Sequence, residues 1–272
     1  MSGVKVKDAR VVITGAGSGI GEATALRCAR AGAEVVCVDI DGGAAETTAS
    51  ACREHGAVAV AHLCDVADAG AVHDLAERVE CEHGPVDVLV NNAGVGIGGP
   101  FLDASVEDWD WLMGVNLDGV AYGCRAFGTR MVKRGHGHVV NVASGAAYTM
   151  SRDMAAYCAS KAAVLALSKC LRADWASSGV GVTAICPGVI NTPIASRTRM
   201  VGDLAARQER IVRAFRFGHS PDLVAKAIIR AVERDQAVVP VGLESELAYR
   251  LLPLVPGPIH GLLARTPLSQ VI

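Results

Sequence analysis

A tyrosine and a lysine stand four residues apart in this chain, as Tyr157 and Lys161, and Ser144 lies 13 residues before the tyrosine. Apolar residues recur at helical spacing from Met154 to about Ser177, which predicts a helix with Tyr157 and Lys161 on one face. A free phenol ionises near pH 10, about 4 kcal/mol too costly for a base at neutral pH. A fixed cation close by favours the phenolate, so the pair could serve as a general base.

A tyrosine and a lysine also fall at this spacing by chance on many helices, so the rest of the chain decides the interpretation. Residues 138–142 form a short apolar run rich in valine, which predicts a buried strand. The polar and small residues that follow predict a loop at the carboxyl end of that strand. Ser144 is expected at this opening.

A glycine-rich turn lies near the amino terminus. Residues 11–13 predict a buried strand, and the stretch 14–21 turns that strand into a helix that runs to about Ala31. Gly15, Gly19 and Gly21 would let the backbone approach a pyrophosphate, while the helix amino terminus offers unpaired N–H groups and the positive end of its dipole. A glycine cluster between a strand and a helix is the context that dinucleotide binding requires.

The next predicted strand, 34–39, ends in a carboxylate 18 residues after the last glycine of the turn. Asp39 is therefore placed to accept a hydrogen bond from the ribose 2′-hydroxyl of NAD and to repel the extra phosphate of NADP. Neither Ser18 nor Ile40 supplies the basic side chain that would favour NADP. The alternative is that Asp39 caps the following helix, but Asp41 is the better candidate for that cap.

An asparagine, Asn116, falls inside a long helical pattern from Ser105 to about Lys133. Asparagine is locally unfavourable inside a helix because its side chain competes for backbone hydrogen bonds. Some feature of the fold is expected to compensate it.

Strand and helix patterns alternate about seven times, which predicts an α/β fold with a doubly wound parallel sheet of Rossmann type in a single domain. Four motifs stand along it. They are T-G-x-x-x-G-x-G at 14–21, N-N-A-G at 91–94, Y-x-x-x-K at 157–161 after Ser144, and P-G-x-x-x-T at 187–192. Together they resemble the classical short-chain dehydrogenases/reductases, and the resemblance covers residues 11 to about 241.

The resemblance implies a reversible hydride transfer between NAD and a secondary alcohol or ketone. Tyr157 would take the hydroxyl proton, and Lys161 would lower the tyrosine pKa and hold the ribose. Ser144 would orient the carbinol oxygen, and Asn116 would support a proton relay through a water. Substrate contacts are expected from Ser144, Ala146, Tyr157 and Val189. Cofactor contacts are expected from Gly15, Ser18, Gly19, Ile20, Gly21, Asp39, Asp65, Val66, Asn92, Ala93, Gly94, Tyr157, Lys161, Pro187, Gly188, Val189 and Thr192.

Composition excludes several other functions. Of 272 residues, 51% are hydrophobic and 20% charged, and the net charge of −2 argues against nonspecific nucleic-acid binding. The amino terminus carries no apolar signal-like run, which predicts a cytoplasmic protein. Nine cysteines with no C-x-x-C pair are expected to be reduced core residues. The eight histidines show no metal-ligand spacing, so no metal is expected.

The carboxyl-terminal part is expected to shape the substrate. Residues 193–219 are polar, rich in arginine and mobile in character, and predict a short lid whose arginines form either a solvated helix face or an anion contact. The serine at 220 predicts a helix start. The apolar extension 243–272 contains prolines that exclude a membrane span, and would cover the pocket, a neighbouring subunit or a membrane surface peripherally.

The residues that the motifs place around the reacting carbon are almost wholly uncharged, which predicts a bulky, apolar substrate such as a steroid or terpenoid. They are Val95, Ile97, Gly145, Ala146, Ala147, Tyr148, Met150, Met154, Val189 and Ile190. By resemblance, helices 105–133 and 154–177 would pair in a homodimer or homotetramer. Three alternatives stay open: an NADPH-type ketoacyl reductase, a noncatalytic dinucleotide sensor, and a sugar-nucleotide epimerase or dehydratase.

Overall fold

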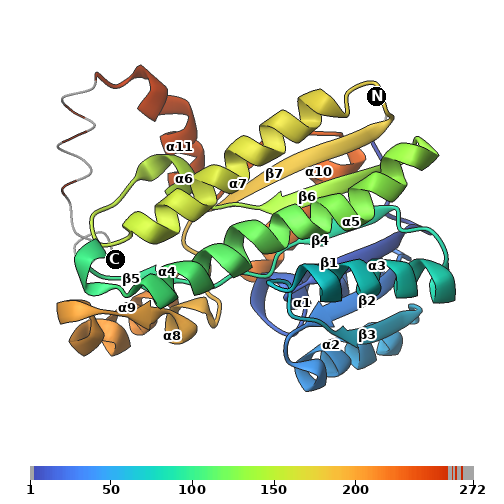
Figure 1. Ribbon diagram of the computed structural model, residues 1–272, viewed down its shortest axis with the longest axis horizontal. Helices are drawn as coiled ribbons and strands as arrows, with labels where there is room; N and C mark the ends of the chain where they lie inside the picture. Colours follow the sequence, from blue (N-terminus) through green and yellow to red (C-terminus); the bar gives the residue numbers. More distant parts are fainter. Residues whose placement is uncertain (1–2, 257–258, 260, 262–264, 266–272) are drawn as a thin grey trace.

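A seven-stranded parallel sheet forms the centre of the computed structural model, which describes residues 3–256, 259, 261 and 265. The strands lie in the order β3-β2-β1-β4-β6-β7-β9 (Figure 1). The chain winds outward from β1 to β3, returns beside β1 with β4, and then winds outward the other way, which confirms the predicted doubly wound fold. The strands are β1 (Arg10–Thr14), β2 (Glu34–Asp39), β3 (Ala59–Leu63), β4 (Val88–Asn91), β6 (Gly137–Val142), β7 (Val180–Pro187) and β9 (Val238–Val241).

Helices cover both faces of the sheet (Figure 1). Because both faces are covered, strands β4, β6 and β7 are buried along their whole length. One layer packs α1, α2 and α10 on a core of valine, isoleucine and alanine, and the other packs α3, α5 and α7. Their bounds are α1 (Gly19–Arg30), α2 (Gly42–Glu54), α3 (Ala69–His83), α5 (Gly119–Arg134), α7 (Ala155–Asp174) and α10 (Pro221–Glu233).

Two predicted helix caps are confirmed. Asp41 accepts hydrogen bonds from the backbone N–H groups of Gly43 and Ala44 at 3.0 and 3.1 Å, which leaves Asp39 free of that role. Ser220 accepts from the N–H of Asp222 at 3.2 Å and begins α10.

The predicted helical pattern over residues 105–133 is present, with one irregular turn at the asparagine. It begins as α4 (Val106–Met113) behind a capping box of Ser105 and Asp108, widens into a π-helical turn, η2 (Gly114–Asp118), and continues as α5. Asn116 lies in the π turn. A π turn adds a residue to the helix and displaces the asparagine side chain from the regular pattern, which the apolar periodicity does not reveal.

The lid region is folded rather than irregular. It contains α8 (Ile194–Arg197), β8 (Arg199–Met200), η3 (Gly202–Arg207) and α9 (Gln208–Phe215). Strand β8 pairs in parallel with β5 (Ile97–Gly98), which precedes the short turn η1 (Phe101–Asp103). Arg199 fixes the lid to α4, because its guanidinium lies 2.8 Å from the Asp108 carboxylate and 3.7 Å from the ring centroid of Trp111.

The carboxyl-terminal extension begins with α11 (Leu243–Leu251) and η4 (Leu252–Leu254). Helix α11 packs against α6 (Ala146–Thr149), a short helix in the loop after β6. The ring centroids of Tyr148 and Tyr249 lie 5.4 Å apart, and the Tyr148 hydroxyl hydrogen-bonds the Ser245 side chain. Most of the extension beyond residue 256 lies outside the described residues. Within the described part, no helix is long and apolar enough to cross a membrane.

Candidate active site

The predicted catalytic side chains meet at the carboxyl end of β6. Ser144 lies in the loop after that strand, and its side chain hydrogen-bonds Tyr157 in the first turn of α7. The Nζ of Lys161, one turn later, lies 5.9 Å from the Tyr157 ring centroid and donates to the carbonyl oxygen of Val142 at 3.0 Å. The structure thus brings hydroxyl, phenol and ammonium to one place.

Burial controls the protonation of this group. Burial raises the pKa of Tyr157, while the hydrogen bond with Ser144 acts in the lowering direction and the nearby Cys158 in the raising direction. Burial also lowers the pKa of Lys161 to about 8. The expectation that Lys161 lowers the tyrosine pKa stays a prediction, because burial is the largest influence on both groups.

Asn116 is fully buried, and its side chain is satisfied by the loop after β4. Its amide nitrogen donates to the Val95 carbonyl at 3.0 Å and to the Ser160 hydroxyl at 3.1 Å, and its oxygen accepts from the Val95 N–H at 2.8 Å. This is the compensation that the sequence required. A Cβ on Gly94 would lie 3.4 Å from both the Asn116 oxygen and the Lys161 nitrogen, so the two side chains flank that glycine.

The glycine-rich turn is held against the N-N-A-G stretch. The Asn92 amide donates to the carbonyl oxygens of Thr14 and Gly15 at 2.9 and 3.1 Å, and the Thr14 hydroxyl accepts from the Ala93 N–H at 3.1 Å. Gly15 has a φ of 64°, and a Cβ on Gly21 would lie 2.0 Å from the Gly15 oxygen. A side chain at either position would strain or displace the turn.

This turn leaves donors available for an anion. The N–H groups of Gly19, Ile20 and Gly21 have no acceptor within the described part of the chain, and the Ser18 side chain makes no cap. They stand at the amino terminus of α1, where the helix dipole is positive. The lid adds a cation, because a guanidinium nitrogen of Arg197 lies 3.2 Å from the Ser18 hydroxyl.

Asp39 lies partly buried beside the turn at the end of β2. Its carboxylate accepts from the Gly17 N–H at 2.8 Å and from the Asp41 N–H at 3.0 Å. After β3, the Asp65 carboxylate accepts from the Ala67 N–H at 2.9 Å, and Val66 is buried against α5. The side chain of Ile40 next to Asp39 is 69% exposed and carries no charge.

The segment after β7 shows a contact that the sequence did not predict. The Val189 N–H donates to the Glu244 carboxylate at 2.9 Å, and the other carboxylate oxygen lies 3.0 Å from His219. Burial acts to raise the pKa of Glu244, but hydrogen bonds from its own backbone, His219 and Val189 together hold that pKa below its usual value. A Cβ on Gly188 would lie 2.0 Å from the same carboxylate. Thr192 lies beside the glycine turn, 3.2 Å from where a Cβ on Gly19 would be.

A buried polar network beneath the site was also missed. Asn91 donates to the Asn141 side chain at 2.9 Å, and Asn141 donates to Ser168 at 3.0 Å, joining β4, β6 and α7. All three side chains are at most 3% exposed. Asparagine in the middle of otherwise apolar strands was the signal that could have revealed them, since buried amides need partners.

Apolar side chains surround Tyr157 on the lid side. Ile97, Leu112 and Ala156 form a small buried cluster that packs against the tyrosine ring and two tryptophans. Trp109 and Trp111 were not among the predicted pocket residues. Of those that were, Ala147 and Ile190 pack into the two main cores, while Ala146, Tyr148 and Val189 are partly exposed and Met150 is 61% exposed.

Comparison with known proteins matches this fold and site. A family profile described as short chain dehydrogenase matches residues 9–201. The chain is 46% identical over 257 residues to "Probable oxidoreductase EphD" of Mycobacterium tuberculosis, covering 92% of this chain and 43% of that protein. It is 37% identical over 223 residues to D-threitol dehydrogenase of Mycolicibacterium smegmatis, covering 81% of this chain and 84% of that protein.

A solved structure of a short chain dehydrogenase/reductase has the same fold as this chain. The structure of a short chain dehydrogenase/reductase from Burkholderia phymatum in complex with NAD is 32% identical, with a TM-score of 0.86 over 97% of this chain and 98% of that one. The chain therefore belongs to the short-chain dehydrogenase family, a family of oxidoreductases. It spans less than half the length of its EphD relative.

Proposed function

We propose that this chain is an NAD-dependent dehydrogenase that interconverts a secondary alcohol and a ketone. The observation that carries the proposal is the hydrogen-bonded pair of Ser144 and Tyr157, with the Lys161 ammonium beside it, at the switch-point edge of the sheet. One chain supplies all three groups that the proposed chemistry needs: the proton acceptor, the hydroxyl that holds the substrate oxygen, and the cation.

The residues present fit a dinucleotide. The unpaired N–H groups at the start of α1 and the Arg197 guanidinium offer positive potential for a pyrophosphate. The carboxylate of Asp39 is held in place by two backbone N–H groups and keeps acceptor capacity for ribose hydroxyls. NAD would supply the acceptor for the hydride that leaves the carbinol carbon.

The proton and the hydride of the alcohol go to different acceptors. The phenolate of Tyr157 takes the hydroxyl proton while the C–H electron pair leaves as hydride, so the C–O bond becomes a carbonyl. Ser144 donates to the substrate oxygen and holds it within reach of the phenol. One N–H of Lys161 is used by Val142, which leaves two for the cofactor ribose and for the charge that develops on Tyr157.

We further propose a bulky, mostly apolar substrate. The cluster of Ile97, Leu112, Ala156 and the two tryptophans offers apolar surface beside Tyr157, which rewards burial of apolar groups by roughly 25 cal/mol per Å². The relative named for D-threitol bears a polyol in its name, so small polyols are the competing substrate class. Turnover of NAD with steroid and terpenoid alcohols against C4 and C5 polyols separates the two classes.

The cofactor preference gives the first prediction. We expect a kcat/KM with NAD at least about tenfold above that with NADP, because Asp39 would face the 2′-phosphate with like charge. Asp39→Ala should narrow the difference. Asp41→Ala removes a carboxylate from the same loop that only caps α2, and should leave the preference unchanged. Equal efficiency with both cofactors in the unmodified protein contradicts the assignment.

A further inference from the structure

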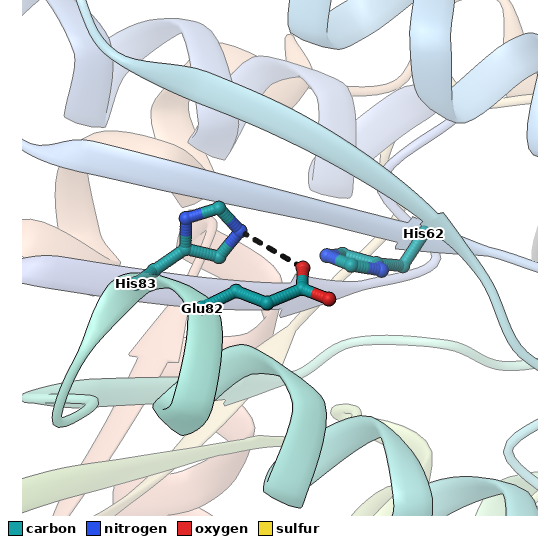
Figure 2. Close-up of side chains that lie close together, drawn as sticks. All are labelled: His62, Glu82 and His83. Carbon is teal, nitrogen blue, oxygen red and sulfur yellow. Dashed lines mark ion pairs between the residues drawn. The ribbon is translucent and has the colours of Figure 1, made fainter.

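A cluster of two histidines and a glutamate lies at the far edge of the sheet from β9, away from the catalytic residues. His62 comes from the edge strand β3, while Glu82 and His83 close the last turn of α3 (Figure 2). One ligand atom from each residue lies within 4.8 Å of the other two. His62 and Glu82 are 20 residues apart, so no short sequence motif predicts the cluster.

We propose that these three side chains form a zinc site that joins β3 to α3. Two atoms about 2.1 Å from a tetrahedral zinc ion lie roughly 3.4 Å apart. The Nε2 of His83 is already 3.7 Å from the Glu82 carboxylate, and the two imidazole rings lie 6.3 Å apart at their centroids. Side-chain movements of about 1 Å would bring the three ligand atoms to the distance at which they coordinate one zinc ion. Glu82 is more than half exposed, so the fourth position is open to water.

An unsatisfied nitrogen supports the same conclusion. The Nε2 of His62 is buried, yet it has no hydrogen-bond partner in the described part of the chain. Buried side-chain nitrogens are almost always paired, because an unpaired one loses its hydration without compensation. In Figure 2 the His62 ring and the Glu82 carboxylate face each other. A metal ion between His62 and Glu82 would satisfy that nitrogen.

The electrostatics of the cluster favour a cation on balance. The cluster lies at the carboxyl terminus of α3, the negative end of the helix dipole, and contains one carboxylate. Burial lowers the pKa of His62, with Glu82 acting in the opposite direction. Arg78, one turn earlier on α3, is the charge that opposes a cation there.

The chemistry of the ligands selects the ion. Two imidazole nitrogens with one carboxylate suit zinc, whereas calcium and magnesium prefer oxygen ligands throughout. The bound ion would fix the edge strand β3, which has a neighbour on one side only. The site is separate from the proposed dehydrogenase site, so its success or failure leaves the proposed function untouched.

The test is calorimetric titration of zinc chloride into the full chain after treatment with a chelator and gel filtration. Cys81→Ser and Cys170→Ser are introduced first, because these exposed thiols would bind zinc adventitiously. We expect one zinc ion per chain with micromolar affinity, and no binding of calcium or magnesium. His62→Ala and His83→Ala should each weaken zinc binding at least about tenfold. His73→Ala, which removes an exposed histidine beside Glu77 on the same helix, should leave it unchanged.

Two further readouts keep the variants interpretable. Zinc at about 100 times its dissociation constant should raise the melting temperature by roughly 5 °C in the parent and not in His62→Ala or His83→Ala. Cobalt in place of zinc should give the visible absorption bands of a tetrahedral site. Equal zinc affinity in the parent and both variants, or no zinc binding by any of them, overturns the proposal. Variants that melt like the parent in the chelator establish that they are folded.

Discussion

Tyr157, the proposed base, lies in surroundings that work against its ionisation. Burial raises its pKa, and only Ser144 acts in the lowering direction. The phenolate is therefore scarce at neutral pH. The fraction of phenolate rises about tenfold for each pH unit below the pKa, and oxidation of the alcohol requires that form.

The pH dependence of the two directions should consequently differ. We expect kcat/KM for alcohol oxidation to rise from pH 7 to 9, and kcat/KM for ketone reduction, which needs the protonated phenol, to stay constant over this range because the tyrosine pKa lies above it. Measurement of both directions over this range checks the expectation. An oxidation kcat/KM that does not change over this interval would mean that the proton acceptor is already deprotonated at pH 7, which contradicts a buried phenol in that role.

The positions of the candidate catalytic residues and of the glycine turn could be predicted from the sequence, because each lies in a motif whose spacing fixes its place on one element. Glu244 was missed for the opposite reason. Its contact with Val189 spans 55 residues and depends on how α11 docks, which local periodicity does not encode. The effect of burial on the tyrosine pKa was not predicted, because a sequence shows the neighbouring cation but not the desolvation.

At the scale of elements, α11 holds a backbone donor of the proposed cofactor site. Family resemblance gives the Val189 N–H to the carboxamide of the nicotinamide, yet here that N–H is bonded to Glu244. Tertiary contacts likewise hold two other features. The lid is held by the contact of Arg199 with Asp108, and Asn116 in the π turn is held by its hydrogen bond with Val95. The strands and long helices were predicted because their buried faces repeat regularly.

We therefore expect Glu244→Gln to bind NAD about three- to tenfold more tightly, because a neutral amide holds the Val189 N–H less strongly than a carboxylate does. Fluorescence titration with NAD measures the change. Glu246→Gln on the same helix, which breaks an exposed pair with Arg250 at 2.6 Å, is the matched control and should have no effect. Weaker binding by Glu244→Gln would show that the contact supports the loop and does not compete for it.

At the scale of the whole molecule, the sheet end opposite the site carries a buried histidine. His138 is the second residue of β6 and is 1% exposed. It hydrogen-bonds Thr183 at 2.8 Å and lies 4.0 Å from Asp235, which pairs with Arg172. Burial lowers the pKa of His138 to about 4, with Asp235 acting to raise it and Arg172 to lower it. The folded protein therefore resists protonation of His138, whereas the unfolded chain does not.

The consequence is acid sensitivity. An unfolded histidine has a pKa near 6.5, so between about pH 6.5 and 4 the unfolded chain binds more protons, and stability falls as pH falls. We expect His138 to contribute about 3 kcal/mol of this loss in the free energy of unfolding. Urea unfolding at several pH values measures how steeply the free energy of unfolding falls as pH falls. This pH dependence should be shallower in His138→Gln and unchanged in His136→Gln, which alters an exposed histidine. The same pH dependence of the free energy of unfolding in the parent and in His138→Gln would contradict this role of His138.

The overall assembly stays a prediction. Helix α7 exposes Ala155, Ala159 and Ala166, small residues that would permit a second copy of the chain to approach closely. A homodimer or homotetramer through α5 and α7 is therefore still expected.

The measurement that tests the central claim most directly is hydride transfer by Tyr157→Phe. This variant keeps the buried ring but removes the hydroxyl that Ser144 holds, so NAD should bind with unchanged affinity while the single-turnover rate of NADH formation falls by about 100-fold to 10,000-fold. The rate is followed by absorbance with an alcohol that the parent oxidises, and NAD affinity by fluorescence on the same preparation. A variant that binds NAD normally and still turns over at more than about a tenth of the parent rate would contradict the account, because another group would then be taking the proton.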